Sequence, residues 1–537
     1  MKLFIKQHGG VLFLLGILMV GLLTIAPYGA YLDQTAEQRI LFANIEEYCI
    51  QFGAEDTQLV QDLQDFGVLP ISIDEDRDHG MAVYYPAFIV WFLNQESLYA
   101  GSMFWHIYTF LINFWGMCSL FLLGKELFKN EKIAAVTTLL FFLSPRMFAE
   151  SHYNNKDVVL LGMVITMFYW TMRLMKEKSV KSLFMLAFVG ALAANMKIIG
   201  AWYFGMLGLY ALIYFIATRQ MDKKLALKAV SCILLWIGLV ILLTPGCWGN
   251  MVDFFEYLFL GAVDYNLWHD YVLFNGKLVH QDYTGMPKKY LPVLILFTTP
   301  IGILLLVVAG SIFALVDLWK KKGDKWSESG FVLMMLFIGL VPLAYAVLAA
   351  TPLYNGWRHF YFVYASMLVA MGYGVYRIWE ILKKRGLQKA GVVAITGYLA
   401  VLAIGIAINY PQEHSYFNML AGKDVVEKYE LDYWDMSVRQ AFDSILEAED
   451  EPVVVSALNV PTHWGLEEIW KFCPEKMKEQ LILTSDWKEW QDADYVIINT
   501  TYAVMYSQEN YAQVKVQYEL IDTFTSYGHI ICEVYKK

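Results

Sequence analysis

The sequence predicts an α-helical protein that crosses a membrane many times and ends in a small α/β domain. Three observations support this prediction. Hydrophobic residues make up 58% of the 537 positions and charged residues only 17%, far from the average soluble domain. Apolar runs recur along residues 1–409, and many approach the roughly 20 residues that cross a bilayer. The gaps between these runs alternate between rich and poor in Lys and Arg.

Eleven apolar runs predict about eleven transmembrane helices of a polytopic membrane protein. They are residues 11–30, 102–124, 133–149, 158–172, 183–195, 198–217, 225–245, 291–318, 331–350, 360–381 and 391–408. The first run could instead be a signal peptide, because Gly29 and Ala30 suit a cleavage site, but its length exceeds a usual signal-peptide core.

Two further segments need separate interpretation. Residues 183–217 are too many for one span, and Asn195, Lys197 and Gly200 interrupt them, so we predict two helices joined by a tight turn. Residues 81–93 are too short and aromatic to span, and they indicate a re-entrant or interfacial segment in the loop 31–101.

The distribution of positive charge predicts which side each loop occupies. Short loops rich in Lys and Arg stay in the cytoplasm. The gaps assigned to that side, with Lys2 and Lys6, hold 22 such residues, and the opposite gaps hold nine. An odd number of spans then places the N-terminus in the cytoplasm and the chain after residue 410 outside, for a protein of the cell (plasma) membrane surrounded by membrane lipids.

After residue 410 the apolar runs shorten to the length of strands. Strands are expected over 453–457, 481–484, 495–499, 517–523 and 529–535, and helices over 440–449 and 466–478. We therefore predict two domains: a transmembrane domain over 1–409 and an extracytoplasmic α/β domain over 410–537. Cys473 and Cys532 lie in the second domain and could pair in an oxidising compartment.

Several classes of function find no support in the sequence. The basic residues lie beside the spans without interleaved aromatic residues, which argues against nucleic acid as a partner. Glycine-rich phosphate loops and dinucleotide fingerprints are absent, so we predict no cofactor. The run 74–79 resembles the start of an EF-hand loop, but Gly80 comes one place late and Tyr85 replaces the bidentate Glu. A solvated acidic loop is favoured, and no metal site is predicted.

Asp33 directly follows the first span, with Glu37 one helical turn further on. Ionisable residues at the mouth of a span are costly and are functional candidates by default. Asp is also a preferred N-cap, so Asp33 could simply cap a helix over 34–48. The position alone leaves both interpretations open.

Cations and further carboxylates gather in the other outer turns. They are Arg146, Lys156 and Asp157 between the third and fourth spans, Lys197 in the next outer turn, and Arg358 and His359 in a later one. A single cation at a helix end is typically a snorkelling anchor. Several cations converging beside carboxylates suit an anionic head group such as phosphate or diphosphate, with its lipid tail held between the spans.

In their order and shared side, these motifs resemble the GT-C class of polyprenyl-phosphate-sugar glycosyltransferases, nearest to the protein O-mannosyltransferase family (glycosyltransferase family 39) and its bacterial relatives. The residues that carry the resemblance are Asp33, His79-Gly80 with Tyr85-Pro86, Ser144-Pro145-Arg146 with Asn155-Lys156-Asp157, residues 273–277, Tyr290-Leu291-Pro292, Trp357-Arg358-His359, and residues 414–418 and 431–434.

The resemblance implies an enzyme that moves a sugar from a polyprenyl-phosphate donor to a protein, lipid or glycan acceptor on the outer face. It implies inversion, with Asp33 as the base that deprotonates the acceptor hydroxyl. The other implied roles are Asp157 in positioning acceptor or donor, Lys197 and Arg358 in holding the lipid phosphate, Arg146 or Lys156 in assisting, and His79, Tyr85 and His359 as further candidates. Gln34 departs from the Asp-Glu pair of the mannosyltransferases, which leaves the acceptor class open.

Two other functions fit parts of the sequence. A transporter or flippase for a lipid-linked sugar should show internal repeats with paired broken helices at mid-membrane, and the sequence has no visible repeat. A divalent-metal-dependent enzyme of the oligosaccharyltransferase kind would use Asp33 with Asp74 or Asp76. Dependence on added divalent cation would distinguish it.

Overall fold

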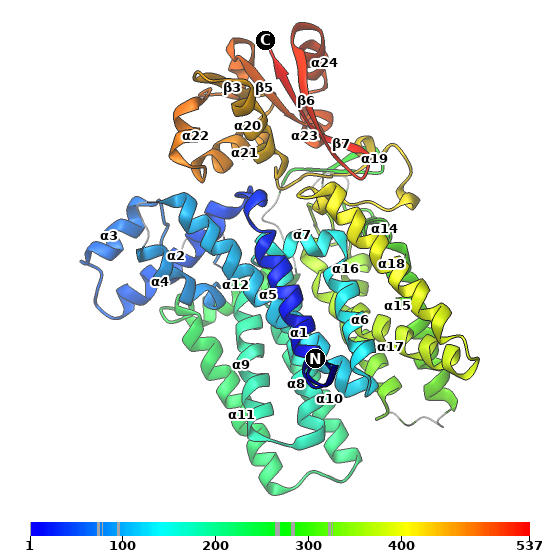
Figure 1. Cartoon of the computed structure of the whole chain (residues 1–537). Helices are drawn as coiled ribbons and strands as arrows, with labels where there is room; N and C mark the ends of the chain where they lie inside the picture. Colours follow the sequence, from blue (N-terminus) through cyan, green and yellow to red (C-terminus); the bar gives the residue numbers. More distant parts are fainter. Residues whose placement is uncertain are drawn as a thin grey trace.

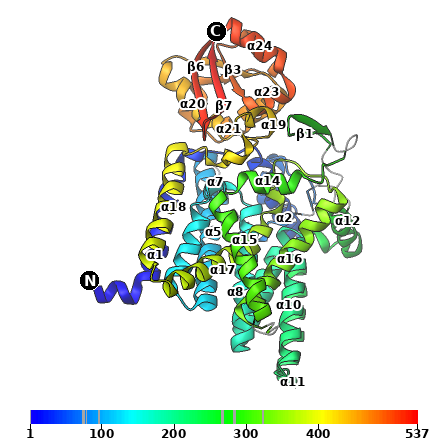
Figure 2. The same ribbon diagram turned by 90° about the vertical axis from the view of Figure 1, so that its right-hand side faces the viewer.

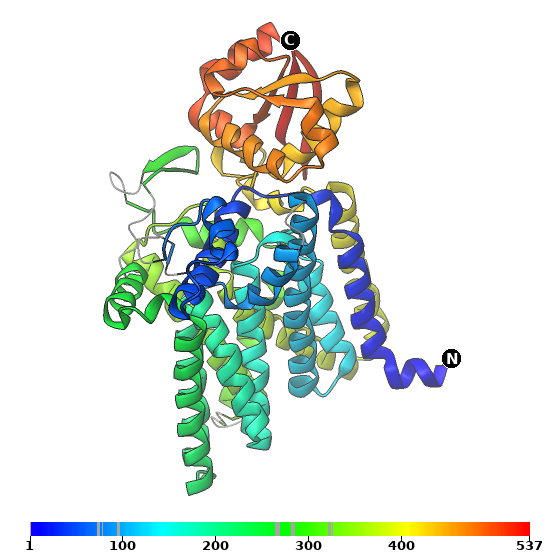
Figure 3. The same ribbon diagram turned by 90° about the vertical axis from the view of Figure 1, so that its left-hand side faces the viewer.

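The computed structural model describes residues 2–71, 76, 77, 79–93, 97–263, 269–280, 285–320, 324 and 326–537, with the side chains of 2–7, 262 and 263 left out. Its helices form a bundle, and a five-stranded sheet with its own helices covers one end of that bundle (Figure 1). The N-terminus of α1 lies away from the sheet domain (Figures 2 and 3).

Within the described residues, eight helices are long and apolar enough to cross a membrane, which makes this a multi-pass membrane protein. They are α1 (Lys2–Leu23), α5 (Leu98–Phe128), α8 (Asp157–Glu177), α10 (Ile199–Ala217), α11 (Lys223–Leu243), α15 (Ile301–Lys320), α16 (Glu328–Ala349) and α18 (Gln388–Asn409). The most apolar part of α8 is 89% buried, whereas those of α11 and α18 are 11% buried, so α8 lies at the centre and the other two at the periphery.

By length and composition, eight helices of the described residues qualify as spans, or nine if one bent pair counts as a span, while the sequence predicts about eleven. The pair is α6 (Glu131–Phe142) and α7 (Pro145–Tyr153), which meet at 74°. Ser144 is extended there, because a residue before proline avoids the helical region. The helix α9 (Val180–Met196) has only 17 residues, and α17 (Phe362–Lys384) buries its first half inside the bundle.

Two predictions about breaks in the helices have opposite outcomes. The predicted division of residues 183–217 is confirmed, because α9 ends at Met196 and α10 begins at Ile199. The predicted single span over 291–318 is wrong. It consists of α14 (Tyr290–Thr298) and α15, interrupted at Thr299-Pro300.

The outer loops form short helices and a hairpin at the end of the bundle that carries the sheet domain (Figures 1 and 3). They are α2 (Gln34–Gln51), α3 (Gln58–Asp65), η2 (Ala82–Tyr84), α4 (Tyr85–Leu93), α12 (Met251–Val263), and the strands β1 (Tyr271–Phe274) and β2 (Lys277–His280). The predicted helix after Asp33 is confirmed as α2. The hairpin was not predicted, although Asn275 and Gly276 both have positive φ, as a two-residue hairpin turn requires.

The five strands of the sheet domain confirm the predicted strands to within a few residues. They are β3 (Val453–Ala457), β4 (Leu481–Leu483), β5 (Tyr495–Asn499), β6 (Glu519–Ser526) and β7 (His529–Lys536), in the order β4-β3-β5-β7-β6. The strand β3 is parallel to β4 and β5, and β7 is antiparallel to β5 and β6. Cys473 and Cys532 are both buried and free.

Helices pack against this sheet. They are α20 (Ser437–Ala448), α21 (Val460–Lys471), α22 (Glu475–Gln480), α23 (Thr500–Tyr506) and α24 (Gln508–Gln517). The predicted single helix over 466–478 is wrong, because Pro474 stands between α21 and α22 and adopts an extended conformation.

Residues 410–436 connect α18 to the sheet domain and pack into the bundle. They contain η5 (Glu413–Ser415), η6 (Met419–Ala421) and α19 (Val425–Lys428). Phe417, Tyr429 and Trp434 belong to the apolar core of the bundle, and the core of the sheet domain begins at Val438. The apolar core therefore changes about 28 residues after the predicted boundary at 410.

Candidate active site

Asp33 forms an ion pair with Arg358 at the end of the bundle that carries the sheet domain. The distance from Asp33 Oδ2 to Arg358 Nη1 is 3.2 Å, and the Asp33 side chain is 28% exposed while that of Arg358 is 9% exposed. Asp33 occupies the N-cap position of α2 but accepts no capping hydrogen bond there. The carboxylate is therefore partly exposed and held by a cation, and its side chain does not cap α2.

A second ion pair joins Lys197 to Asp157, with 2.6 Å between Nζ and Oδ1. Asp157 is the first residue of α8, and Lys197 lies in the turn between α9 and α10. Lys197 Nζ also lies 3.5 Å from Nδ1 of His359, the neighbour of Arg358 in η4 (Arg358–Phe360). The two pairs are thus adjacent.

Burial, together with the nearby Lys197 and Arg358, holds the pKa of His359 well below its ordinary value. The imidazole is therefore neutral, so Nδ1 can accept a hydrogen bond from the Lys197 ammonium. Its Nε2 atom is buried and has no hydrogen-bond partner within the described structure. A neutral ring with an unused nitrogen is available to a polar ligand beside the two cations.

A third ion pair joins Lys156 to Glu37, with 2.9 Å between Nζ and Oε1. Asn155 donates to the other Glu37 oxygen at 3.4 Å and accepts from the Tyr31 hydroxyl at 3.0 Å. Burial raises the pKa of Glu37, and Lys156 opposes this effect. Glu37 therefore compensates Lys156 and connects α2 to the turn before α8.

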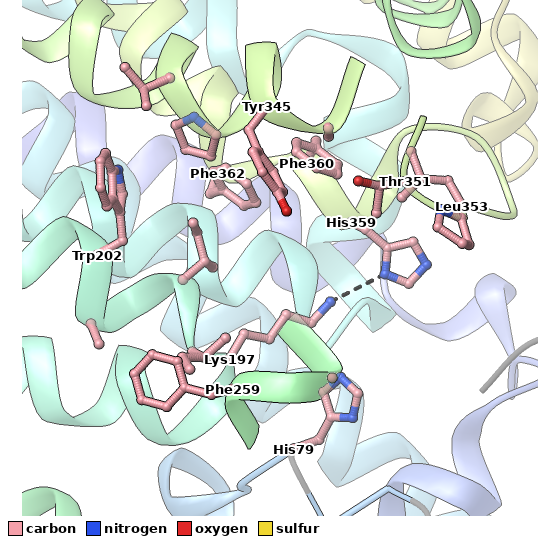
Figure 4. A pocket seen from close by; sticks show the side chains of 18 of the residues that line it. His79, Lys197, Trp202, Phe259, Tyr345, Thr351, Leu353, His359, Phe360 and Phe362 are labelled. Atoms are coloured by element: carbon pink, nitrogen blue, oxygen red, sulfur yellow. Dashed lines mark hydrogen bonds between the residues drawn. The ribbon is translucent and has the colours of Figure 1, made fainter. Parts of the chain in front are cut away.

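A cavity of about 640 Å³ lies beside these groups. Figure 4 shows its wall, including Trp202, Phe259 and Tyr345, together with the nitrogen-bearing side chains of Lys197 and His359. His79 also lines it, and Asp76 Oδ1 lies 3.7 Å from Nδ1 of His79. The space is mostly apolar and carries a cationic group, as a lipid phosphate with a hydrocarbon tail requires.

Arg146 and Tyr85 do not line this cavity. Arg146 is buried in α7, where it donates to the Tyr433 hydroxyl at 3.0 Å and to the carbonyl of Tyr416 at 3.3 Å. The Tyr85 hydroxyl donates to the carbonyl of Leu243 at 2.7 Å. Both residues therefore tie segments of the structure together. Lys156 is held by Glu37 and does not line the cavity either.

Trp434 is a site residue to which the sequence assigned no role. Its ring lies 4.3 Å from the guanidinium carbon of Arg358. It belongs to the motif 431–434, but nothing in the local pattern connects that motif to Arg358. Its contact arises only from the path of the chain between the bundle and the sheet domain.

The acidic run 74–79 can be assessed only in part. Asp74, Glu75 and Asp78 lie outside the described residues. The nearby His79 imidazole lowers the pKa of Asp76 below its ordinary value. In the part of the chain that the structure describes, no group of three His, Cys, Asp or Glu side chains could hold a metal ion.

The site lies in a multi-pass helical bundle that carries paired carboxylates and cations at one end. Residues 83–248 match the family model described as dolichyl-phosphate-mannose-protein mannosyltransferase. This region includes Arg146, Asp157 and Lys197. The resemblance to GT-C glycosyltransferases is confirmed over this region.

No curated protein matches the chain in sequence. Among solved structures it is similar to an arabinofuranosyltransferase, AftD, from Mycobacteria, with 10% sequence identity and a TM-score of 0.37. The match covers 86% of this chain and 35% of that chain, so the present protein spans about a third of its length.

Proposed function

We propose that the protein transfers a sugar from a polyprenyl-phosphate donor to an acceptor hydroxyl on the extracytoplasmic face of the cell membrane. One observation above all supports this proposal. An accessible carboxylate, Asp33, is paired with Arg358, whose neighbour His359 lines an apolar cavity together with Lys197. A base and a binding site for a lipid phosphate thus lie next to each other.

The donor lipid occupies the apolar cavity, and its phosphate binds Lys197 at the cavity wall and Arg358, which is next in the chain to the lining residue His359. Both cations are compensated by carboxylates, Asp157 and Asp33, while the donor is absent. A phosphate oxygen can replace a carboxylate as partner of the guanidinium or ammonium group, since charge-assisted hydrogen bonds to both anions are strong. Asp157 keeps Lys197 in place, and His79 and His359 add polar contacts.

In the reaction, Asp33 accepts the proton of the acceptor hydroxyl, and the acceptor oxygen attacks the anomeric carbon. The bond between that carbon and the phosphate oxygen breaks, and its electron pair leaves with the phosphate. Lys197 and Arg358 stabilise the negative charge that develops on the leaving group. Attack from the face opposite the phosphate inverts the anomeric carbon.

The acceptor, a protein, lipid or glycan, approaches Asp33 from the side of the sheet domain. In this proposal the N-terminus is cytoplasmic and the sheet domain extracytoplasmic, as the excess of Lys and Arg in the opposite loops indicates. Arg146, Lys156 and Tyr85 maintain the structure around the site, and their side chains make no contact with the donor.

The direct test is to incubate the purified protein in bilayers with a panel of polyprenyl-phosphate sugars and to follow the release of polyprenyl phosphate. We expect release for at least one donor, and no effect of a divalent-metal chelator. Release that stops with the chelator would indicate the metal-dependent alternative. Movement of a lipid-linked sugar between leaflets without any release would indicate a transporter.

A further inference from the structure

Trp434 lies where the chain passes from the bundle to the sheet domain, and it contacts Arg358 and the residue before Asp33. Its carbonyl accepts a hydrogen bond from the backbone N–H of Leu32 at 3.1 Å, one residue before Asp33. Its indole ring lies 4.3 Å from the guanidinium carbon of Arg358. The side chain is almost fully buried, with 3% of the residue exposed.

We propose that Trp434 is a positioning residue, which holds Arg358 in the orientation that the donor phosphate requires. This inference rests on the proposed function. It adds that the segment leading into the sheet domain completes a site otherwise built from the bundle and its outer loops. Trp434 acts through Arg358 and does not itself contact the reacting atoms.

The geometry explains why an indole suits this role. A guanidinium group has a flat face and an edge that carries its N–H donors. The Trp434 ring contacts Arg358 without accepting a hydrogen bond from it, so Arg358 can exchange Asp33 for a phosphate oxygen without losing this support. The attraction between a cation and an indole ring is largest where both are removed from water, and Arg358 is 8% exposed.

The Trp434 ring is itself held by aromatic contacts. The ring of Tyr31 meets it edge-on with centroids 5.5 Å apart, and the ring of Tyr153 lies 6.0 Å away. The indole Nε1 is buried and has no hydrogen-bond partner in the described structure. Replacement by Phe therefore removes no hydrogen bond and keeps an aromatic ring over Arg358.

The test uses the full-length protein in bilayers with the donor that supports turnover. We expect Trp434→Leu to lower kcat/KM for the donor about tenfold, the loss expected from a desolvated cation–π contact. Trp434→Phe should lose only several-fold, because a phenyl ring still attracts the guanidinium but more weakly than an indole. Trp464→Leu is the matched control, because Trp464 is 46% exposed on α21 of the sheet domain and should leave turnover unchanged.

A double-mutant cycle separates positioning from a general structural role. The readout is affinity for polyprenyl phosphate, measured for Trp434→Leu, Arg358→Ala and the double variant. If Trp434 acts through Arg358, the Leu substitution has no further effect once Arg358 is absent. Equal losses in both backgrounds would overturn the proposal, as would wild-type affinity in Trp434→Leu.

If Trp434→Leu does not fold, the same cycle is run with Trp434→Phe, for which a several-fold loss that depends on Arg358 is expected. A loss that is absent, or independent of Arg358, would overturn the proposal. The proposed function fails separately if Asp33→Asn and Arg358→Ala both turn over donor at the wild-type rate. If the Asp33 and Arg358 variants are impaired but the effect of substituting Trp434 does not depend on Arg358, the proposed function stands and the positioning role of Trp434 is refuted.

Discussion

At the scale of single residues, each cation of the site is matched by a carboxylate. Asp33 with Arg358, Asp157 with Lys197 and Glu37 with Lys156 form three pairs. The sequence predicted the cations but not their partners, because Asp33 and Arg358 lie 325 positions apart. Pairing follows from burial, since a buried charge without a partner is very costly.

Removing Lys197 or Arg358 should weaken the site for the donor phosphate. We expect Lys197→Ala and Arg358→Ala each to lose at least about tenfold in turnover, since a charge-assisted hydrogen bond is removed. Arg358→Lys should not restore full activity, because an ammonium group cannot reproduce the guanidinium fork. Donor affinity and turnover in bilayers provide the measurement.

Lys423→Ala is the control for those variants, because Lys423 is an exposed cation in the segment that leads into the sheet domain. The double variant tests whether the two cations act on one phosphate. If each single substitution leaves turnover unchanged and the two effects simply add in the double variant, Lys197 and Arg358 are separate anchors. That result would contradict the phosphate site.

Glu413 is expected to make stability depend on pH. Burial raises its pKa from 4.5 to about 8, and its Oε2 accepts a hydrogen bond from Tyr28 at 3.2 Å. Between these two values the folded protein binds a proton that the unfolded chain lacks, so the free energy of unfolding falls as pH rises. Above about pH 8 the stabilisation that the protonated Glu413 contributes is completely lost.

Glu413→Gln carries no ionisable group, so it should match the wild type near pH 4 and have an increasingly higher Tm as the pH rises to 9. Thermal unfolding in detergent across this range measures the difference, with the exposed Glu509→Gln as control. Parallel Tm curves for wild type and Glu413→Gln would contradict the assignment.

At the scale of elements, hydrophobic patterns predicted the type of structure better than its interruptions. The strands β3 and β5 match their predicted limits, because short apolar runs bounded by polar residues leave little choice. The helix over 466–478 and the span over 291–318 were predicted without their breaks at Pro474 and Pro300. Proline removes a backbone donor and clashes with the preceding turn, and the apolar pattern does not register that effect.

The contact between α5 and α8 should be sensitive to a single methyl group on one side only. A Cβ at Gly116 would lie 2.5 Å from the Cα of Gly162, whereas a Cβ at Gly162 would lie 3.5 Å from the Cα of Gly116. Gly116→Ala must therefore push the helices apart, at a cost of about 1–3 kcal/mol. Gly162→Ala makes only ordinary contact.

Thermal unfolding of both variants in the same detergent measures the difference. We expect a lower Tm for Gly116→Ala and little change for Gly162→Ala. Gly208→Ala in α10 is a further control, since a Cβ there has open space within 4 Å. Equal Tm values for the Gly116 and Gly162 variants would show that the two helices can separate freely.

At the scale of the whole molecule, composition predicted a membrane bundle but not which of its helices lie buried inside it. Hydropathy does not distinguish a helix facing lipid from one buried among other helices. The helix α17 illustrates the limit, because its first 13 residues are all buried. The sequence also could not predict the contacts between the loops and the connecting segment 410–436, because tertiary packing alone brings Trp434 to the site.

Sidedness can be tested by the accessibility of introduced cysteines in intact cells. We expect Lys277→Cys in the β1–β2 hairpin to react with an impermeant reagent and Lys223→Cys at the start of α11 to be protected. The labelling of the six native cysteines is measured in the protein without an introduced cysteine and subtracted. Equal labelling at both positions would contradict the topology and the shared outer face of the site.

The central claim is that Asp33 is the catalytic base, and Asp33→Asn tests it most directly. The account predicts that turnover of the polyprenyl-phosphate donor falls by about 10² to 10⁴, the usual contribution of a general base. Affinity for polyprenyl phosphate should be retained, because Arg358 stays in place on Trp434. Asp65→Asn, an exposed carboxylate at the end of α3, should be fully active. Near-normal turnover of Asp33→Asn, with wild-type donor affinity, would contradict the account.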